Sequence, residues 1–298
     1  MEGTHVGQVL PLDTPAFWIE QWNAMNAGRA AFGGYGSAAT WNAMAASDGE
    51  HSNAEQRKAH ADEVIRAVEQ KGLNLAGARI LDVGCGTGSY AEAFARRGAE
   101  VVCVDIAEKM IERLEAEVAP EVRTCIRTEI ADWRTLDLSA RRFESAFDLV
   151  FANMTPAVAG PEPFLKLMRA SRNLCWFRGW AGAREDSLLD YLHRELTGEP
   201  PPTSRGNFLY AFNLVCASGC FPDCSFAARR WTRRKTIEEW TAFYSVFFTH
   251  AASESLPEAK IRSRLGRIAV DGCVEQHARG CTGRMLWSVT PRNGGERQ

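Results

Sequence analysis

The stretch "ILDVGCGTGSY", residues 80–90, ends a short apolar run in glycines at alternate positions. Glycines at a strand end form a tight loop and allow a ligand to come closer to the backbone than a side chain would permit. Here they are Gly84, Gly86 and Gly88, and Ser89 stands where the third glycine of the dinucleotide fingerprint G-x-G-x-x-G would fall. The loop therefore predicts a ligand site and disfavours a nicotinamide dinucleotide as its ligand.

Outward from this loop, short apolar stretches alternate with amphipathic ones. The apolar stretches predict buried strands at 78–83, 100–105, 122–130, 147–153 and 173–179, and the stretches between them predict helices at 89–98, 108–117 and 161–172. Nearly continuous apolar strands separated by helices indicate a parallel sheet that is covered on both faces. We therefore predict a doubly wound, Rossmann-like α/β domain, in which ligands bind beyond the carboxyl ends of the strands.

Composition excludes some classes of function. The chain has 35 basic and 37 acidic residues, so it lacks the positive charge expected of a nucleic-acid-binding protein. It has no run of about 18 apolar residues and no basic, then apolar, leader at its start, so we expect a cytoplasmic protein without a membrane partner. Its nine cysteines are an odd number, and reduced thiols fit better than a disulfide framework. Nothing in the sequence predicts an oligomeric state.

Four motifs, in the right order, make residues 56–180 resemble the class I S-adenosylmethionine-dependent methyltransferases. "LDVGCGTG" (81–88) matches the first motif of that family, and "VVCVDIAEKMIERL" (101–114) matches its second strand, the terminal acid and the helix that follows. "EIADWRTL" (129–136) and "FDLVFANMTPAV" (147–158) occupy the third and fourth positions. The resemblance implies S-adenosyl-L-methionine as the cofactor and a last strand, here 284–290, that runs antiparallel.

The resemblance also assigns roles in cofactor binding. Asp105 can accept bonds from both ribose hydroxyls, because a carboxylate offers two acceptor oxygens, although it could also cap the following helix. Asp82 would orient the loop or the cofactor ammonium group through water. Asp132 and Trp133 would contact the adenine, with a loop acid beside a core tryptophan as the alternative. The set is completed by Gly84, Cys85, Gly86, Gly88, Tyr90, Ile106 and Asn153.

Methyl transfer from a sulfonium is an in-line displacement, in which the enzyme mainly aligns donor and acceptor and excludes water. Asn153 is the candidate catalytic residue, because it is the first polar residue after the fourth-motif strand, although it could merely cap that strand. It is followed by Met154, Thr155 and Pro156 rather than the two prolines and aromatic residue of the family's amino-group methylases. We predict a small-molecule acceptor; a catalytically silent cofactor-binding protein is the alternative.

Acceptor recognition is expected outside the motifs. Residues 1–55 are rich in aromatic residues and glycine and predict a helical arm that acts as a lid. We expect residues 56–290 to form the methyltransferase domain, with an acceptor-specific insertion at about 181–235 between the fifth and sixth strands. Residues 291–298 are expected to be a disordered tail. Within this part we expect a helix at 183–196, a strand at 225–232 and a capping box, Thr236 with Glu239, that opens a helix. Candidate acceptor contacts are Trp22, Trp41 and Trp176 as apolar walls and Arg178 as a partner for an acidic group; core tryptophans and a surface arginine are the alternatives.

Two groups of cysteines could indicate a metal. Cys216, Cys220 and Cys224 recur every four residues, and Cys273 and Cys281 flank His277 further along the chain. Three thiolates can hold zinc, an iron–sulfur cluster or a soft metalloid substrate. Glycine and proline between the first three cysteines would break a helix that aligned them. We predict ordinary packing cysteines and no metal, with thiol-assisted metalloid methylation as the alternative.

Overall fold

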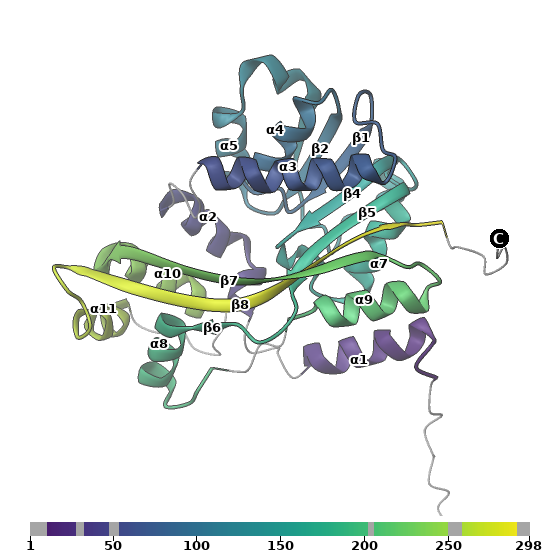
Figure 1. The fold of residues 1–298 in the computed structure, drawn as a ribbon. Helices are drawn as coiled ribbons and strands as arrows, with labels where there is room; N and C mark the ends of the chain where they lie inside the picture. The colour runs from purple at the N-terminus through teal and green to yellow at the C-terminus, as the bar shows by residue number, and fades with distance from the viewer. Residues whose placement is uncertain (1–10, 28–32, 48–53, 202–205, 250–257, 291–298) are drawn as a thin grey trace, which may run out of the picture.

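The computed structural model describes residues 11–27, 33–47, 54–201, 206–249 and 258–290 (Figure 1). Its central sheet has the strand order β3-β2-β1-β4-β5-β8-β6, with β7 paired to β8. The strands β1 (Arg79–Val83), β2 (Glu100–Asp105), β3 (Ile126–Ile130), β4 (Phe147–Asn153) and β5 (Ser171–Trp180) are parallel, whereas β8 (Cys273–Ser288) runs antiparallel to β5. The doubly wound fold and the antiparallel last strand are thus confirmed.

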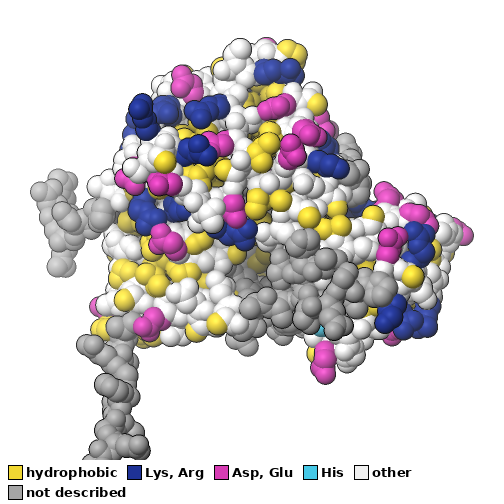
Figure 2. Space-filling view, turned by 180° about the vertical axis from the view of Figure 1, so that it is seen from behind, with side chains coloured by type: hydrophobic (Ala, Val, Ile, Leu, Met, Phe, Trp, Pro, Cys, Tyr) yellow, Lys and Arg dark blue, Asp and Glu magenta, His cyan; other side chains and the backbone are white. Residues whose placement is uncertain are grey.

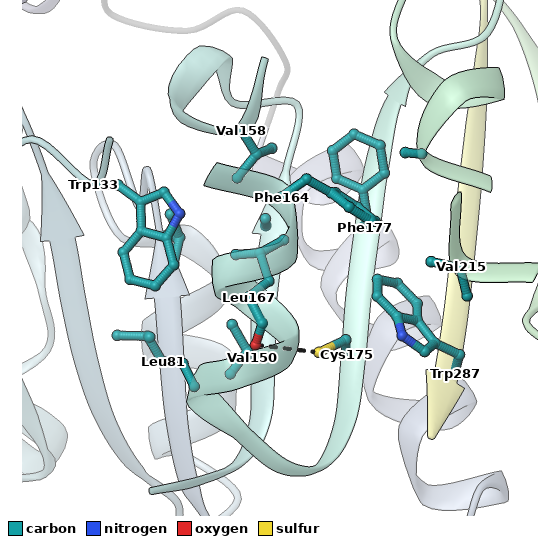
Figure 3. Close-up of a cluster of buried hydrophobic side chains, with 14 of the residues drawn as sticks. Leu81, Trp133, Val150, Val158, Phe164, Leu167, Cys175, Phe177, Val215 and Trp287 are labelled. Atoms are coloured by element: carbon teal, nitrogen blue, oxygen red, sulfur yellow. Dashed lines mark hydrogen bonds between the residues drawn. The ribbon is translucent and has the colours of Figure 1, made fainter. Parts of the chain in front are cut away.

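Both faces of the sheet are covered, because successive strand residues point to opposite sides. Ile80 packs with α3 (Ala54–Gln70), α4 (Ser89–Ala95) and α5 (Glu108–Glu117) on one face. Leu81 belongs to the cluster on the other face, which is covered by α7 (Pro161–Ala170), α9 (Phe208–Ala217) and the N-terminal α1 (Pro15–Ala27). Figure 3 shows part of this second cluster, where Phe164 and Leu167 of α7 lie against Val150 and Phe177 of the strands.

A second lobe is built on two long strands. β7 (Asp223–Thr236) pairs with β8 along its whole length, and both run well beyond the parallel strands (Figure 1). Packed on this extension are α8 (Ser187–Thr197), which follows the short β6 (Glu185–Asp186), and α10 (Ile237–Thr249) and α11 (Glu258–Gly266). We call these three helices and the outer halves of β7 and β8 the second lobe. Its core is aromatic, with Trp240, Tyr244 and Phe247 buried together.

Several element boundaries differ from the sequence expectation. β7 extends beyond the expected 225–232 at both ends, and β8 begins well before the expected 284–290. Residues 273–283 carry few large apolar side chains, so there is little signal in the sequence for the start of β8. The strand expected at 122–130 begins as a 3₁₀ helix, η2 (Pro120–Cys125), and β6 takes the start of the helix expected at 183–196. The capping box is confirmed, since Thr236 N donates to Glu239 Oε2 at 2.9 Å and Glu239 N to Thr236 Oγ1 at 3.2 Å.

The N-terminal segments lie in two separate places. α1 packs on α9 and α7, and Trp22 within it is fully buried. The short helix η1 (Gly33–Gly36) and α2 (Ala38–Ser47) pack instead on α5 and α10. The other parts of the expected arm, and the expected tail 291–298, lie outside the described residues. Within the described part of the chain, no helix is both long and apolar enough to cross a lipid bilayer.

Candidate functional site

A cavity of about 250 Å³ opens at the carboxyl edge of the sheet, where the loops that follow β1, β2, β3 and β4 converge. Tyr35, Gly36 and Trp41 of η1 and α2 complete its wall from the N-terminal side. The fold therefore brings together most of the site residues expected from the sequence: Asp82, Gly84, Cys85, Gly86, Tyr90, Asp105, Ile106, Asp132, Trp133, Asn153 and Trp41.

The three glycines of the loop after β1 have positive φ angles but different neighbours. A Cβ at Gly84 would overlap the side chain of Thr155, and one at Gly88 would overlap Leu114 of α5. A Cβ at Gly86 would meet nothing within 4 Å. Gly84 and Gly88 are therefore needed for close packing within the protein. Gly88 does not line the cavity, so its contact with the cofactor stays a prediction.

Asp105, at the end of β2, holds the glycine loop in place. Its Oδ2 accepts from Gly86 N and its Oδ1 from Ala107 N, both at 2.9 Å. It is not the cap of α5, because Ala107 occupies that position without a side-chain bond. Burial raises the pKa of Asp105, and the backbone amides partly offset that effect. Each oxygen keeps a second acceptor position, so ribose hydroxyls remain possible partners.

Of the two acids Asp82 and Asp105, Asp82 has the more strongly shifted pKa. It is 2% exposed, and its Oδ2 has no hydrogen-bond partner among the described residues. Burial, with a further contribution from the charge of Asp105, raises the pKa of Asp82 to about 8. A cation in the cavity would favour the ionised form of this carboxyl group. The arrangement thus fits a ligand with a positively charged or N–H-donating end.

Tyr90 and Asn153 lie at the same end of the cavity. The Tyr90 ring packs on Phe151 of β4 with ring centroids 4.9 Å apart, and the Asn153 side chain lies near the Tyr90 hydroxyl. Burial, more than any charge, raises the pKa of Tyr90 to about 12. Asn153 Oδ1 is buried without a partner among the described residues, which leaves a second acceptor in the cavity wall. The following residue, Met154, has φ 55°, a left-handed conformation that a side chain rarely adopts.

At the opposite end of the cavity, Asp132 is already paired with Arg134. Arg134 donates from Nε to Asp132 Oδ1 at 2.9 Å and from Nη2 to Oδ2 at 2.7 Å, and the Arg134 guanidinium holds the pKa of Asp132 below its usual range. Arg134 also donates to Gly36 O of η1 at 3.1 Å. Asp132 therefore has a competitor for the expected adenine amine. Trp133 serves both functions weighed from the sequence, since it lines the cavity and is 1% exposed in the core (Figure 3).

Sequence reasoning missed Arg134, Tyr35 and Thr155 as parts of this wall. Arg134 lies within the third motif, next to Trp133, so its position carried a usable signal. Tyr35 lies in a glycine-rich segment far from the motifs, and only the packing of η1 on α10 brings it to the cavity. Thr155 Oγ1 accepts from Ala157 N at 3.1 Å and thereby caps η3 (Pro156–Val158) beside the glycine loop.

Three expected acceptor contacts do not line the cavity. Trp22 packs against Phe164 on the opposite face of the sheet, with ring centroids 5.6 Å apart. Trp176 is 1% exposed and stacks on Phe151 beneath the cavity. Both are core residues, because their rings are enclosed by helices on either face. Arg178 is also buried rather than solvated, and it lies beside the cavity wall without forming part of it.

The cysteines are free thiols throughout. Cys220 is buried, Cys216 is half-buried and Cys224 is exposed on β7. Among the residues that the structure describes, no three His, Cys, Asp or Glu side chains are placed to hold a metal ion. Burial raises the pKa of Cys216, Cys220 and Cys224, which disfavours thiolate chemistry there.

Comparison with known proteins identifies the domain. Residues 80–174 match the family described as "Methyltransferase domain". Magnesium-protoporphyrin O-methyltransferase of Rhodobacter capsulatus is 30% identical over 120 residues, which are 40% of this chain and 54% of that protein. Ubiquinone biosynthesis O-methyltransferase of Chromobacterium violaceum is 36% identical over 113 residues, 36% of this chain and 44% of that protein. The chain thus spans about half of these curated relatives, or less.

Among solved structures, magnesium protoporphyrin IX methyltransferase of Synechocystis PCC 6803 with bound S-adenosylhomocysteine has 14% identity and a TM-score of 0.45, over 92% of this chain and 98% of that one. A doubly wound sheet with a glycine loop and strand-end acids around one cavity defines an α/β protein that binds a nucleoside-type cofactor. The domain match assigns residues 80–174 of this chain to that methyltransferase domain family. The cofactor of that family is S-adenosyl-L-methionine.

Proposed function

We propose that this protein transfers a methyl group from S-adenosylmethionine to a small-molecule acceptor by in-line displacement. One observation carries the proposal. One cavity is walled by the motif residues and by the aromatic side chains Tyr35 and Trp41. Two buried oxygens in this wall, Asp82 Oδ2 and Asn153 Oδ1, have no hydrogen-bond partner among the described residues. Asp82 Oδ2 fits a donor group of the cofactor and Asn153 Oδ1 fits a donor group of the methyl acceptor, for which the aromatic side chains offer an apolar wall.

The residues divide into cofactor and acceptor groups. When bound, S-adenosylmethionine supplies an electrophilic methyl group on a sulfonium. Asp105 would accept from the ribose hydroxyls with the lone pairs left free by Gly86 and Ala107, and Asp82 would face the ammonium end. Ile106 and Trp133 would flank the adenine. Asp132 also lines the cavity, but it is paired with Arg134 and has no cofactor contact in this assignment.

The remaining wall would align the acceptor and exclude water. Displacement at a sulfonium gains mainly from orientation and desolvation, and the Tyr90 ring and Asn153 form the wall of the cavity at the end opposite Asp132. Asn153 Oδ1 would accept a hydrogen bond from the acceptor. We infer an oxygen acceptor, which is supported by the O-methyltransferase names of the relatives and by the departure of residues 153–156 from the amino-group methylase motif.

The charge distribution supports a small acceptor rather than a polyanion. On the face shown in Figure 2, Lys and Arg side chains are intermixed with Asp and Glu over the described residues. A nucleic-acid-binding surface would require basic side chains gathered on one face. The net charge of -2 agrees with this inference.

Calorimetry with S-adenosylhomocysteine tests the proposal. The wild-type protein should bind it, and Asp105→Ala should weaken binding about ten- to a hundredfold, because charge-assisted bonds to hydroxyls are lost. Asp148→Ala is the matched control, since Asp148 lies on β4 near its far end and pairs with Arg172. Equal affinity of Asp105→Ala and wild type would remove Asp105 from the ribose site. Release of S-adenosylhomocysteine with an acceptor library separates an enzyme from a catalytically silent binding protein.

A further inference from the structure

Arg178, near the end of β5, is a buried cation without an anionic partner. It is 8% exposed, and among the described residues its guanidinium makes a single hydrogen bond, 3.4 Å long, to Thr282 Oγ1. A guanidinium that loses its hydration without gaining a carboxylate is costly to bury. Burying an unpaired charge lowers the stability of the fold, so we look for the partner of Arg178 in a ligand.

Arg184 is a second buried arginine of this chain, and unlike Arg178 it has a structural role. Its Nη2 donates to Asp186 Oδ2 at 2.6 Å, and its guanidinium lies against the rings of Trp180 and Trp231. The charge of Arg184 is therefore compensated within the protein. Arg178 has no corresponding carboxylate among the described residues, so the two arginines differ in kind.

The strand register places Arg178 beside the end of the cavity that Asn153 lines. Asn153 of β4 pairs with Arg178, and Met154 N donates to Arg178 O at 2.8 Å. Asn153 and Met154 both line the cavity. Because alternate strand residues share a face, the Arg178 side chain is on the same face as Trp176, the face that α3 crosses (Figure 1). An acceptor at Asn153 would thus lie one strand away from Arg178.

Positive charge exceeds negative charge on this part of the face. Arg284 of β8 pairs with Arg178 in register, but its charge is matched by Glu63 of α3 at 3.1 Å. Arg229 of β7, on the same face by the register of β7 and β8, has His60 as its neighbour, with Nη1 and Nε2 3.2 Å apart. Burial and the charge of Arg229 lower the pKa of His60, so the imidazole is neutral there at pH 7. Arg178 and Arg229 are therefore positive charges of this face that have no carboxylate partner among the described residues.

We propose that Arg178 binds an anionic group of the methyl acceptor, a carboxylate or a phosphate, and that Arg229 adds positive charge at the same face. The inference rests on the proposed function, because it takes the acceptor to lie at the Asn153 end of the cavity. The planar fork of a guanidinium matches two oxygens of either group, so the acceptor would supply the partner that the fold lacks. The substrate class is accordingly a small organic acid or phosphate ester.

Matched probes test this site on the protein saturated with S-adenosylhomocysteine. Benzoate, phenyl phosphate and benzamide share a ring, and benzamide lacks the charge. Titration calorimetry should show that benzoate or phenyl phosphate binds about tenfold or more tightly than benzamide. The tighter of the two anions identifies carboxylate or phosphate recognition. Arg178→Gln should lose the preference, whereas Arg172→Gln, on the same strand but half-exposed and paired with Asp148, should keep it.

Folding controls keep the result decisive. Arg178→Lys keeps the charge and should retain part of the preference, and the melting temperature and S-adenosylhomocysteine affinity of each variant report an intact fold. Equal binding of acid and amide by the wild type, or an undiminished preference in Arg178→Gln, overturns the anion site. Failure of the wild type to bind S-adenosylhomocysteine contradicts the methyltransferase proposal instead, so the two failures are distinguishable.

Discussion

Two carboxyl groups on neighbouring strands differ because of their hydrogen bonds. Asp105 receives backbone amides on both oxygens, whereas Asp82 Oδ2 receives none among the described residues. Hydrogen bonds to a carboxylate stabilise its charged form and burial destabilises it. The pKa of Asp82 is consequently raised to about 8, while the backbone amides limit the rise for Asp105. The residue type is identical, and the local donors decide its charge.

Asp82 should make the stability of the ligand-free protein depend on pH. Its pKa rises from 3.8 to about 8 on folding, so between these values the folded state keeps a proton that the unfolded chain releases. The stabilising contribution is complete below about pH 4 and is lost as the pH rises through 8. Asp82→Asn removes this dependence. Urea unfolding from pH 5 to 8 should show the variant gaining on the wild type as the pH increases; parallel curves would contradict the assignment.

Lys166 holds the segment that follows β3, at the Asp132 end of the cavity. Its Nζ donates to the carbonyl oxygens of Trp133, Arg134 and Leu136 at 2.9, 3.1 and 2.8 Å. Lys166→Met would leave these buried carbonyls without their donor, at about 1–3 kcal/mol for each one that water cannot reach. We expect a lower melting temperature and weaker binding of S-adenosylhomocysteine. Arg169→Met, on the same helix but half-exposed, should change neither.

Among the elements, the N-terminal segments have two different relations to the cavity. Trp22 of α1 is enclosed on the far face of the sheet, whereas Tyr35 of η1 and Trp41 of α2 line the cavity itself. Lys109 N of α5 donates to Asn42 Oδ1 at 3.0 Å, which ties α2 to the helix that follows Asp105. A lid role is therefore proposed for η1 and α2 only, and not for α1.

Amide hydrogen exchange should separate these segments. Addition of S-adenosylhomocysteine should increase protection within Gly33–Gly36 and Ala38–Ser47, because a ligand in the cavity contacts their side chains. Protection of Pro15–Ala27 should stay the same, because its packing on α9 does not involve the cavity. Equal changes in both segments, or none in either, would contradict the division.

At the scale of the whole molecule, one buried polar network joins the second lobe to the cavity wall. Asp186 accepts from Arg184 Nη2 at 2.6 Å, from Gln276 Nε2 at 2.9 Å and from Leu189 N at 3.2 Å, where it caps α8. Arg184 continues to the Tyr35 hydroxyl at 3.4 Å. Because Tyr35 lines the cavity and also packs on Phe247 of α10, the second lobe contacts the cavity wall.

Removal of the central acid should therefore destabilise the protein strongly. Asp186→Ala leaves the charge of Arg184 buried and unpaired, which we expect to reduce the free energy of unfolding by about 3–5 kcal/mol. Glu185→Ala is the control on the adjacent residue, because the Glu185–Arg279 pair is exposed and should contribute little. Chemical unfolding of both variants checks the difference, and similar losses would rule out a special role for the buried network.

The sequence alone determined the parallel sheet, the position of the glycine loop, the strand-end acids and the capping box. Each depends on local rules, since apolar periodicity, glycine conformation and hydrogen bonds three residues apart act within a few residues of the chain. Tertiary structure alone decided that Trp22 and Trp176 are core residues, that Gly88 serves α5, and that Arg178 is buried without a carboxylate. Burial depends on which distant segments pack together, and a tryptophan or an arginine looks the same in the sequence whether it faces a core, a cavity or water.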